Sequence, residues 1–119
     1  MSSKVQYTVE FSIQQGQQAS FKNQLKEIIP FIKSSEPGAL MYEFYFNSDE
    51  SKCYVQEQYA DSPAMLSHLA NVAPRLQEIL KISAITRLEI FGALSPEAHA
   101  VAESFGASFY TYFDGFTRN

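Results

Sequence analysis

Residues 5–13 alternate strictly between apolar and polar side chains, and this alternation constrains the fold more than any other feature of the chain. The apolar members are Val5, Tyr7, Val9, Phe11 and Ile13. A period of two residues predicts a strand with one apolar and one polar face, as in a sheet that is buried on one side. The chain must therefore supply further elements that cover the apolar face.

A helix with an apolar stripe is predicted after this strand. The stripe consists of Phe21, Leu25, Ile28 and Ile32, which follow one another at helical spacing. Pro30 lies inside the helix and should kink it or tighten its last turn, because proline lacks the amide hydrogen that a helical bond needs. Residues 34–38 include a proline and a glycine and end the helix.

Three further strands are predicted. Residues 40–46 and 52–59 are rich in aromatic and β-branched side chains and form a hairpin across the polar loop of residues 47–51. Residues 85–91 form the fourth strand of the sheet.

Two more helices begin at the Ser-Pro pairs of residues 62–63 and 95–96, because a serine cap followed by proline in the first turn is a helix-start signal. We expect Ser62 to be the cap of the first of them and Pro74 to divide that helix into two. The second is expected to run to about Phe105.

The order of these elements is β-α-β-β-α-β, followed by an extra helix and an aromatic tail. This is the ferredoxin-like split arrangement of the α+β class, with a four-stranded antiparallel sheet and helices on one face. A length of 119 residues indicates one domain over residues 1–119. We expect its core to cover residues 4–92, with the extra helix and tail in residues 95–119.

The sheet face opposite the helices carries large side chains, Met41 and Tyr45, beside the polar Gln56 and Gln58. Two copies that pair sheet to sheet would cover it, which predicts a homodimer. Six of the seventeen aromatic rings lie within residues 105–116. These rings are too apolar to remain in water, so we expect the tail to dock over the cavity of its own chain or across the partner subunit.

Composition excludes several classes of function. The net charge is -4 and the nine Lys and Arg residues are scattered, so we expect no nucleic acid as a partner. No stretch is apolar enough to span a membrane or basic enough to lie on one. Cys53 is the single cysteine, which fits a reducing, cytoplasmic setting. Neither histidine pairs nor cysteine pairs have metal-ligand spacing, and we expect no metal and no cofactor.

Four stretches, in the expected order and on the expected elements, resemble the antibiotic biosynthesis monooxygenase family. They are residues 36–43, residues 55–61, the pair His68-Leu69 and residues 85–92, so that the likeness covers roughly residues 4–92. The resemblance implies the dimeric α+β barrel fold. It also implies a choice among activities, because the family includes cofactor-free oxygenases of phenols and quinols, haem-degrading enzymes and a sugar-phosphate isomerase. The absence of Trp argues against the haem-degrading branch.

His68 is the strongest catalytic candidate. It lies three residues after Met65 and four before Val72, at the border of the apolar stripe that packs toward the sheet. An imidazole in this place can accept a proton from a substrate near neutral pH. In the family that the chain resembles, a histidine of this helix lines the cavity between helices and sheet. The alternative is a structural histidine bonded to a backbone carbonyl.

Glu57 is the second catalytic candidate. It alternates with Val55 and Tyr59 and so belongs to a strand face that is otherwise apolar, where a carboxylate must be paired or have a raised pKa. It could orient His68 or act as a base. The alternative is a structural ion pair with Arg75 or Arg87.

Four other residues are candidates for substrate binding: Tyr42, Tyr45, Tyr59 and Asn71. The tyrosines could stack on a flat aromatic molecule or bond to it, and Asn71 lies close to His68 on the same helix. Together with these residues, the resemblance implies a monooxygenase without cofactor, in which His68 and Glu57 deprotonate a small phenol- or quinol-like substrate that reacts with dioxygen. The alternatives are a cofactor-free isomerase and a non-catalytic protein that binds a small aromatic ligand.

Overall fold

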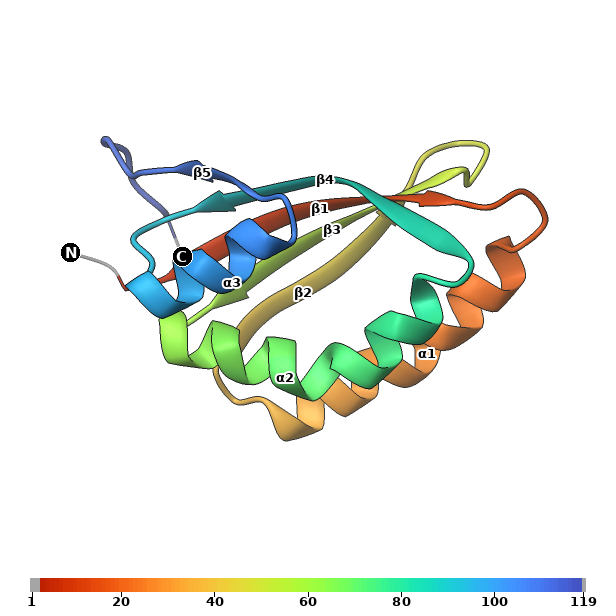
Figure 1. The fold of residues 1–119 in the computed structure, drawn as a ribbon, viewed down its shortest axis with the longest axis horizontal. Helices are drawn as coiled ribbons and strands as arrows, with labels where there is room; N and C mark the ends of the chain where they lie inside the picture. The colour runs from red at the N-terminus through yellow and green to blue at the C-terminus, as the bar shows by residue number, and fades with distance from the viewer. Residues whose placement is uncertain (1–2, 119) are drawn as a thin grey trace.

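The structure, a computed structural model, describes residues 3–118, and within them five strands form one sheet (Figure 1). The strands are β1 (Val5–Ile13), β2 (Ala39–Phe46), β3 (Lys52–Tyr59), β4 (Ser83–Phe91) and β5 (Ser108–Tyr110). Their order across the sheet is β2-β3-β1-β4-β5. The first four pair in antiparallel fashion, whereas β5 pairs parallel to β4. The expected α+β, ferredoxin-like fold is confirmed, with a five-stranded sheet in place of the predicted four strands.

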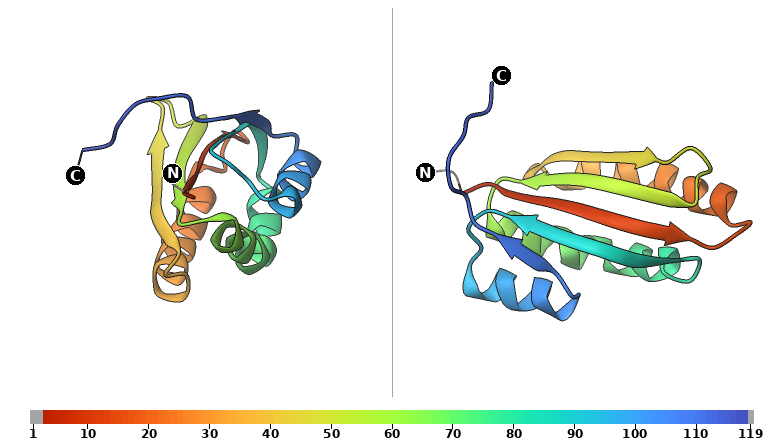
Figure 2. Two further views of the ribbon diagram at one scale, coloured as in Figure 1. Left: turned by 90° about the vertical axis from the view of Figure 1, so that its left-hand side faces the viewer. Right: turned by 90° about the horizontal axis from the view of Figure 1, so that it is seen from above.

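The helices of the described part all lie on one side of this sheet, which curls around them (Figure 2). They are α1 (Gln18–Ser35), α2 (Ser62–Ile79) and α3 (Pro96–Ser104). None of them is long and apolar enough to cross a membrane. α1 buries the predicted stripe, Phe21, Leu25, Ile28 and Ile32, and Pro30 is accommodated within its last turns.

Two details of α2 differ from the prediction. Pro74 does not divide the helix, because Met65, Val72 and Ile79 pack against the core on both sides of the proline and hold the turns in line. The cap is Asp61 rather than Ser62: the Asp61 carboxylate accepts a hydrogen bond from the amide of Ala64 at 2.9 Å.

The Ser62 hydroxyl makes a different contact. It accepts a hydrogen bond from the Ser95 amide at 2.9 Å, which ties the start of α2 to the start of α3. The two Ser-Pro sequences therefore begin helices whose N-terminal ends are joined.

The core lies between the sheet and the helices. All five apolar residues of β1 are buried, as their alternation predicts. The largest fully buried side chains are Tyr59, Phe21, Ile28, Ile32, Met65 and Ile90. These residues come from both layers, so the apolar face of the sheet and the apolar stripes of the helices cover one another.

The opposite face of the sheet is covered by none of the described helices, as the view from above shows (Figure 2). It carries a ladder of polar side chains across β1 and β3. The Thr8 hydroxyl donates to Gln56 Oε1 at 3.0 Å, and the Glu10 carboxylate accepts hydrogen bonds from the hydroxyls of Tyr54 and Thr86. Tyr45 is exposed on the same face.

The aromatic tail divides into two parts. Phe109 of β5 is half-buried and stacks on His99 of α3, with 3.9 Å between ring centroids. Beyond β5 the chain leaves the sheet and runs past its edge (Figure 2). There Phe113 and Phe116 are 95% and 82% exposed. The tail does not cover the cavity of its own chain, because no residue of 107–118 lines that cavity.

Gly92 gives the first testable prediction, because it joins β4 to the segment that leads to α3 at a place with no room for a side chain. Its φ is +124°, and a Cβ atom would lie 2.7 Å from the carbonyl oxygen of Lys4. Gly106 has a φ of +80° with open space around it. We expect Gly106→Ala to cost roughly 1–2 kcal/mol through backbone strain alone, and Gly92→Ala to cost more.

Thermal unfolding of both variants beside the parent protein measures this difference. Equal losses for the two glycines would show that the close approach of Lys4 to Gly92 does not constrain the fold.

Candidate functional site

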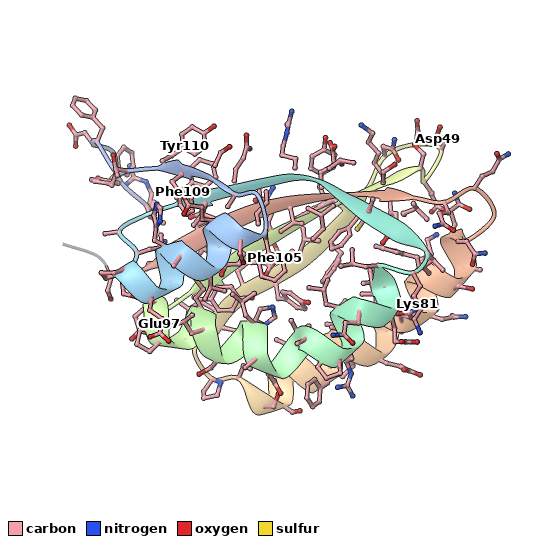
Figure 3. The ribbon with its side chains drawn as sticks, viewed as in Figure 1. Asp49, Lys81, Glu97, Phe105, Phe109 and Tyr110 are labelled. Atoms are coloured by element: carbon pink, nitrogen blue, oxygen red, sulfur yellow. The ribbon has the colours of Figure 1, made fainter. Side chains whose placement is uncertain are left out.

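A cavity of about 80 Å³ lies between the inner face of the sheet and the helices α2 and α3. A single water needs only roughly 10–15 Å³ by this measure, so the cavity can take a small organic molecule. Its walls are apolar or aromatic except for four residues with polar groups, Tyr7, Tyr42, Glu57 and His68. Phe105 borders the cavity from the end of α3, on the helix-covered side of the sheet (Figure 3).

His68 lies at the centre of a short chain of ionisable groups. It projects from α2 and is 3% exposed. Its Nδ1 is 2.8 Å from Glu36 Oε1, and its Nε2 is 3.5 Å from Glu57 Oε1. An ionised carboxylate only accepts hydrogen bonds, so Nδ1 carries the hydrogen and donates it to Glu36. The lone pair of Nε2 then faces Glu57 and the cavity.

Glu36 is a member of the site that the sequence did not identify. It caps the C-terminal end of α1 and is itself buried. The Asn71 amide donates to Glu36 Oε2 at 2.7 Å and to Ser35 Oγ at 3.0 Å, so that each oxygen of the carboxylate has its own donor. The sequence around Glu36 is typical of a turn. Its position one residue beyond a helix is the only feature that could have pointed to Glu36 as a member of the site.

Glu57 projects from β3 toward the helices, as the alternation of that strand predicts. The Tyr59 hydroxyl donates to Glu57 Oε1 at 2.5 Å. Burial raises the pKa of the Glu57 carboxyl above its ordinary range, and the nearby His68 and the bond from Tyr59 oppose this only in part. The alternative of an ion pair with Arg75 or Arg87 is wrong, because the basic group beside Glu57 is His68.

Those two arginines lie elsewhere. The Arg75 guanidinium stacks over the Phe31 ring at 3.9 Å from its centroid. Arg87 lies opposite Glu10 in the β1–β4 register. Neither lines the cavity.

The structure brings two of the three candidate tyrosines to the site. The rings of Tyr42 and Tyr59 lie 5.4 and 4.9 Å from the His68 ring, centroid to centroid. Tyr42 lines the cavity, whereas Tyr59 lies fully buried behind Glu57. Tyr45 is 54% exposed on the outer face of the sheet, where its hydroxyl donates to Glu43, so it does not reach the cavity. Asn71 acts through Glu36 and does not line the cavity either.

Tyr7 is a further polar residue of the cavity that the sequence did not single out. It lies opposite Glu57 in the β1–β3 register, while Tyr42 lies opposite Glu57 in the β2–β3 register. Two tyrosines therefore flank Glu57 on the inner face of the sheet. The alternation of β1 showed only that Tyr7 faces inward.

The arrangement holds a base and an acid close together in a buried and largely apolar place. His68 Nε2 can take a proton, and the raised pKa of Glu57 favours its neutral carboxyl, which can give one. Among residues 3–118, no three His, Cys, Asp or Glu side chains are placed to share a metal ion. Burial raises the pKa of the Cys53 thiol to about 12, so this buried thiol is a poor nucleophile.

Comparison with known proteins places the chain in a family. A sequence model of antibiotic biosynthesis monooxygenases matches residues 7–76. The sequence matches none of the curated proteins with which it was compared. MupZ from Pseudomonas fluorescens is similar in structure with a TM-score of 0.86 and 25% identity, over 99% of this chain and 91% of that protein. The likeness to MupZ thus includes α3 and β5, which lie beyond the family model.

Two more distant structures show the same fold. SnoaB, a cofactor-independent oxygenase from Streptomyces nogalater, has a TM-score of 0.64 and 20% identity, over 79% of this chain and 96% of that one. Rv0793 from Mycobacterium tuberculosis has a TM-score of 0.66 and 17% identity, over 78% of this chain and 97% of that one.

The raised pKa of Glu57 predicts how stability depends on pH. Between the ordinary value of 4.5 and the folded value, the folded protein binds more protons than the unfolded chain, so the free energy of unfolding falls as the pH rises through this range. Glu57→Gln cannot titrate and avoids this loss. We expect its melting temperature to exceed that of the parent protein at pH 7.5, with a smaller difference at pH 4.

Thermal melts at both pH values test this, with Glu103→Gln, which changes an exposed carboxyl of α3, as the control. If the melting temperatures of the parent protein and Glu57→Gln change with pH in parallel, the pKa of Glu57 is not raised.

Proposed function

The chain belongs to the antibiotic biosynthesis monooxygenase family, and from this premise we propose that it is a cofactor-independent monooxygenase of a small phenol- or quinol-like aromatic substrate. The membership confirms the resemblance seen in the sequence. One observation carries the proposal: His68 presents Nε2 toward an apolar cavity while Glu36 holds its Nδ1. SnoaB, a cofactor-independent oxygenase of the same fold, supports it.

The proposed reaction begins with proton transfer. His68 Nε2 takes the hydroxyl proton of the substrate, and Glu36 stabilises the imidazolium that forms. The phenolate is electron-rich enough to donate electrons to dioxygen directly. The apolar walls exclude water from this anion and leave its stabilisation to the few polar groups of the cavity.

Insertion of oxygen then completes the proposed reaction. A carbon–oxygen bond forms at a ring carbon that is ortho or para to the phenolic oxygen and bears a hydrogen, that carbon loses its hydrogen as a proton, and the oxygen–oxygen bond breaks. One oxygen atom stays in the resulting quinone and the other leaves as water. Dioxygen thus receives four electrons, all from the substrate. The neutral carboxyl of Glu57 is the donor for the proton that the leaving oxygen requires.

A cofactor-free isomerase is the second candidate, because His68 and Glu57 form an acid–base pair 3.5 Å apart. Such a pair can take a proton from one atom of a substrate and return it to another without any oxidant. Oxygen consumption during turnover distinguishes the two activities.

The proposal includes the state in which the protein acts. We infer a single domain over residues 1–119, with a core of residues 4–92, in a cytoplasmic homodimer. The outer face of the sheet, with the exposed Tyr45, and the exposed rings of Phe113 and Phe116 are the surfaces that a second copy would cover.

His68→Gln tests the catalytic assignment. The glutamine amide can still donate to Glu36, so the fold should persist, but it cannot take a proton from a substrate. We expect oxygen uptake with a panel of catechols and 1,4-hydroquinones to fall by roughly 100-fold or more. His99→Gln, which changes the exposed histidine of α3, should retain the activity.

Oxygen electrode traces of the three proteins, with a thermal melt of each, give the answer. A folded His68→Gln variant with full activity would remove His68 from the mechanism. Turnover without oxygen uptake would favour the isomerase, and ligand binding without turnover would favour a binding protein.

Removal of residues 111–119 tests the homodimer, since it spares β5. Each large aromatic ring gains about 1.5–3 kcal/mol on burial, so loss of the rings at Phe113 and Phe116 should weaken association and lower the melting temperature together. Light scattering over a dilution series measures the first effect. A full-length chain that is monomeric at micromolar concentration would overturn the dimer.

A further inference from the structure

The Tyr7 hydroxyl is an exception among the buried polar groups of this protein. The side chain is 4% exposed, and among residues 3–118 its hydroxyl is the one buried side-chain polar group without a hydrogen-bond partner. Leaving such a group unpaired costs free energy, and native proteins rarely tolerate it without a reason. A phenylalanine would fill the same space in the core without this cost.

The surroundings of Tyr7 show why its hydroxyl finds no hydrogen-bond partner within its own chain. Tyr7 and Tyr59 pack with their ring centroids 5.3 Å apart, and both lie close to Glu57. Glu57 Oε1 accepts a hydrogen bond from the Tyr59 hydroxyl, and the Tyr7 hydroxyl makes none with Glu57. The remaining walls of the cavity beside Tyr7 are apolar apart from His68 and Tyr42.

The Tyr7 hydroxyl also stays protonated. Burial raises the pKa of Tyr7 well above its ordinary value, and ionisation of the nearby Glu57 would raise it further. It therefore stays protonated at physiological pH and is available as a hydrogen-bond donor. A donor that lines a cavity large enough for a small molecule is suited to an oxygen acceptor on that molecule.

We propose that the Tyr7 hydroxyl binds the substrate, and that the substrate carries an acceptor oxygen distinct from the hydroxyl whose proton His68 removes. The second half of this inference rests on the proposed function, whereas the first half requires only that the cavity binds a ligand. The substrate class is then an aromatic molecule with two oxygen functions, one acidic hydroxyl and one carbonyl-type acceptor. Tyr7 sets specificity, because a ligand that lacks the acceptor leaves its buried hydroxyl unpaired.

Tyr7→Phe separates a ligand role from a structural one, since it removes one oxygen atom and leaves the ring. In the free protein we expect a melting temperature equal to or above that of the parent, because no internal hydrogen bond is lost. The probes are 4-hydroxyacetophenone, which has the acceptor, and 4-isopropylphenol, which lacks it. We expect the parent protein to prefer the first, and Tyr7→Phe to reduce this preference by about tenfold.

Isothermal titration of both probes against both proteins measures the preference. Tyr110→Phe is the matched control, since it removes a hydroxyl from an exposed tyrosine of β5 that does not line the cavity, and it should change neither quantity. A lower melting temperature for Tyr7→Phe, or an unchanged preference, would overturn the proposal.

Two results distinguish this proposal from the proposed function. A preference that depends on Tyr7, in a protein that consumes no oxygen, would support the ligand role and reject the monooxygenase. Failure of the parent protein to bind either phenol would reject both the role of Tyr7 and the substrate class of the proposed function.

Discussion

The pairing of ionisable groups in a buried compartment is the constraint on which the rest of this structure depends. Two carboxyl groups and one imidazole lie buried, and the imidazole is within hydrogen-bond or ion-pair distance of each carboxyl group. Charges that leave water must be paired or neutralised, and this site does both. Glu36 receives bonds from His68 and Asn71, while burial favours the neutral form of Glu57. The contacts that lower the free-energy cost of burying these groups also provide an acid and a base.

This arrangement depends on elements that are distant in the sequence. Glu36 comes from the end of α1, Glu57 from the middle of β3 and His68 from α2, while β1 supplies Tyr7 and α3 leads to Phe105. The sheet curls around the helices (Figure 2), and a cavity lies between them beside the ionisable groups. A shift of α1 or α2 along the sheet would separate Glu36 from His68 and leave a buried carboxylate without its partner.

Patterns of polarity explain which parts of the site could be predicted. His68 and Glu57 are polar residues at positions where the helical and strand periods require apolar ones, and the structure places them 3.5 Å apart. The alternation of β2 also separates Tyr42, which faces inward, from Tyr45, which faces outward, although both are candidates by residue type. Glu36 breaks no period, since it follows a helix in a turn. Tyr7 fits the alternation of β1 as one of its inward-facing residues, so the pattern did not show that its hydroxyl lacks a hydrogen-bond partner.

The sequence by itself determined the elements and their order, because the periods of two and 3.6 residues are local properties of the backbone. The strands β1 to β4, the two Ser-Pro helix starts and the ferredoxin-like order follow from such local signals. Only the tertiary structure decided that α2 continues through Pro74, that β5 adds to the sheet beside β4, and that Glu36 meets His68 across 32 residues. These outcomes depend on packing and electrostatics between segments that are far apart in the chain, and no local pattern encodes their distances.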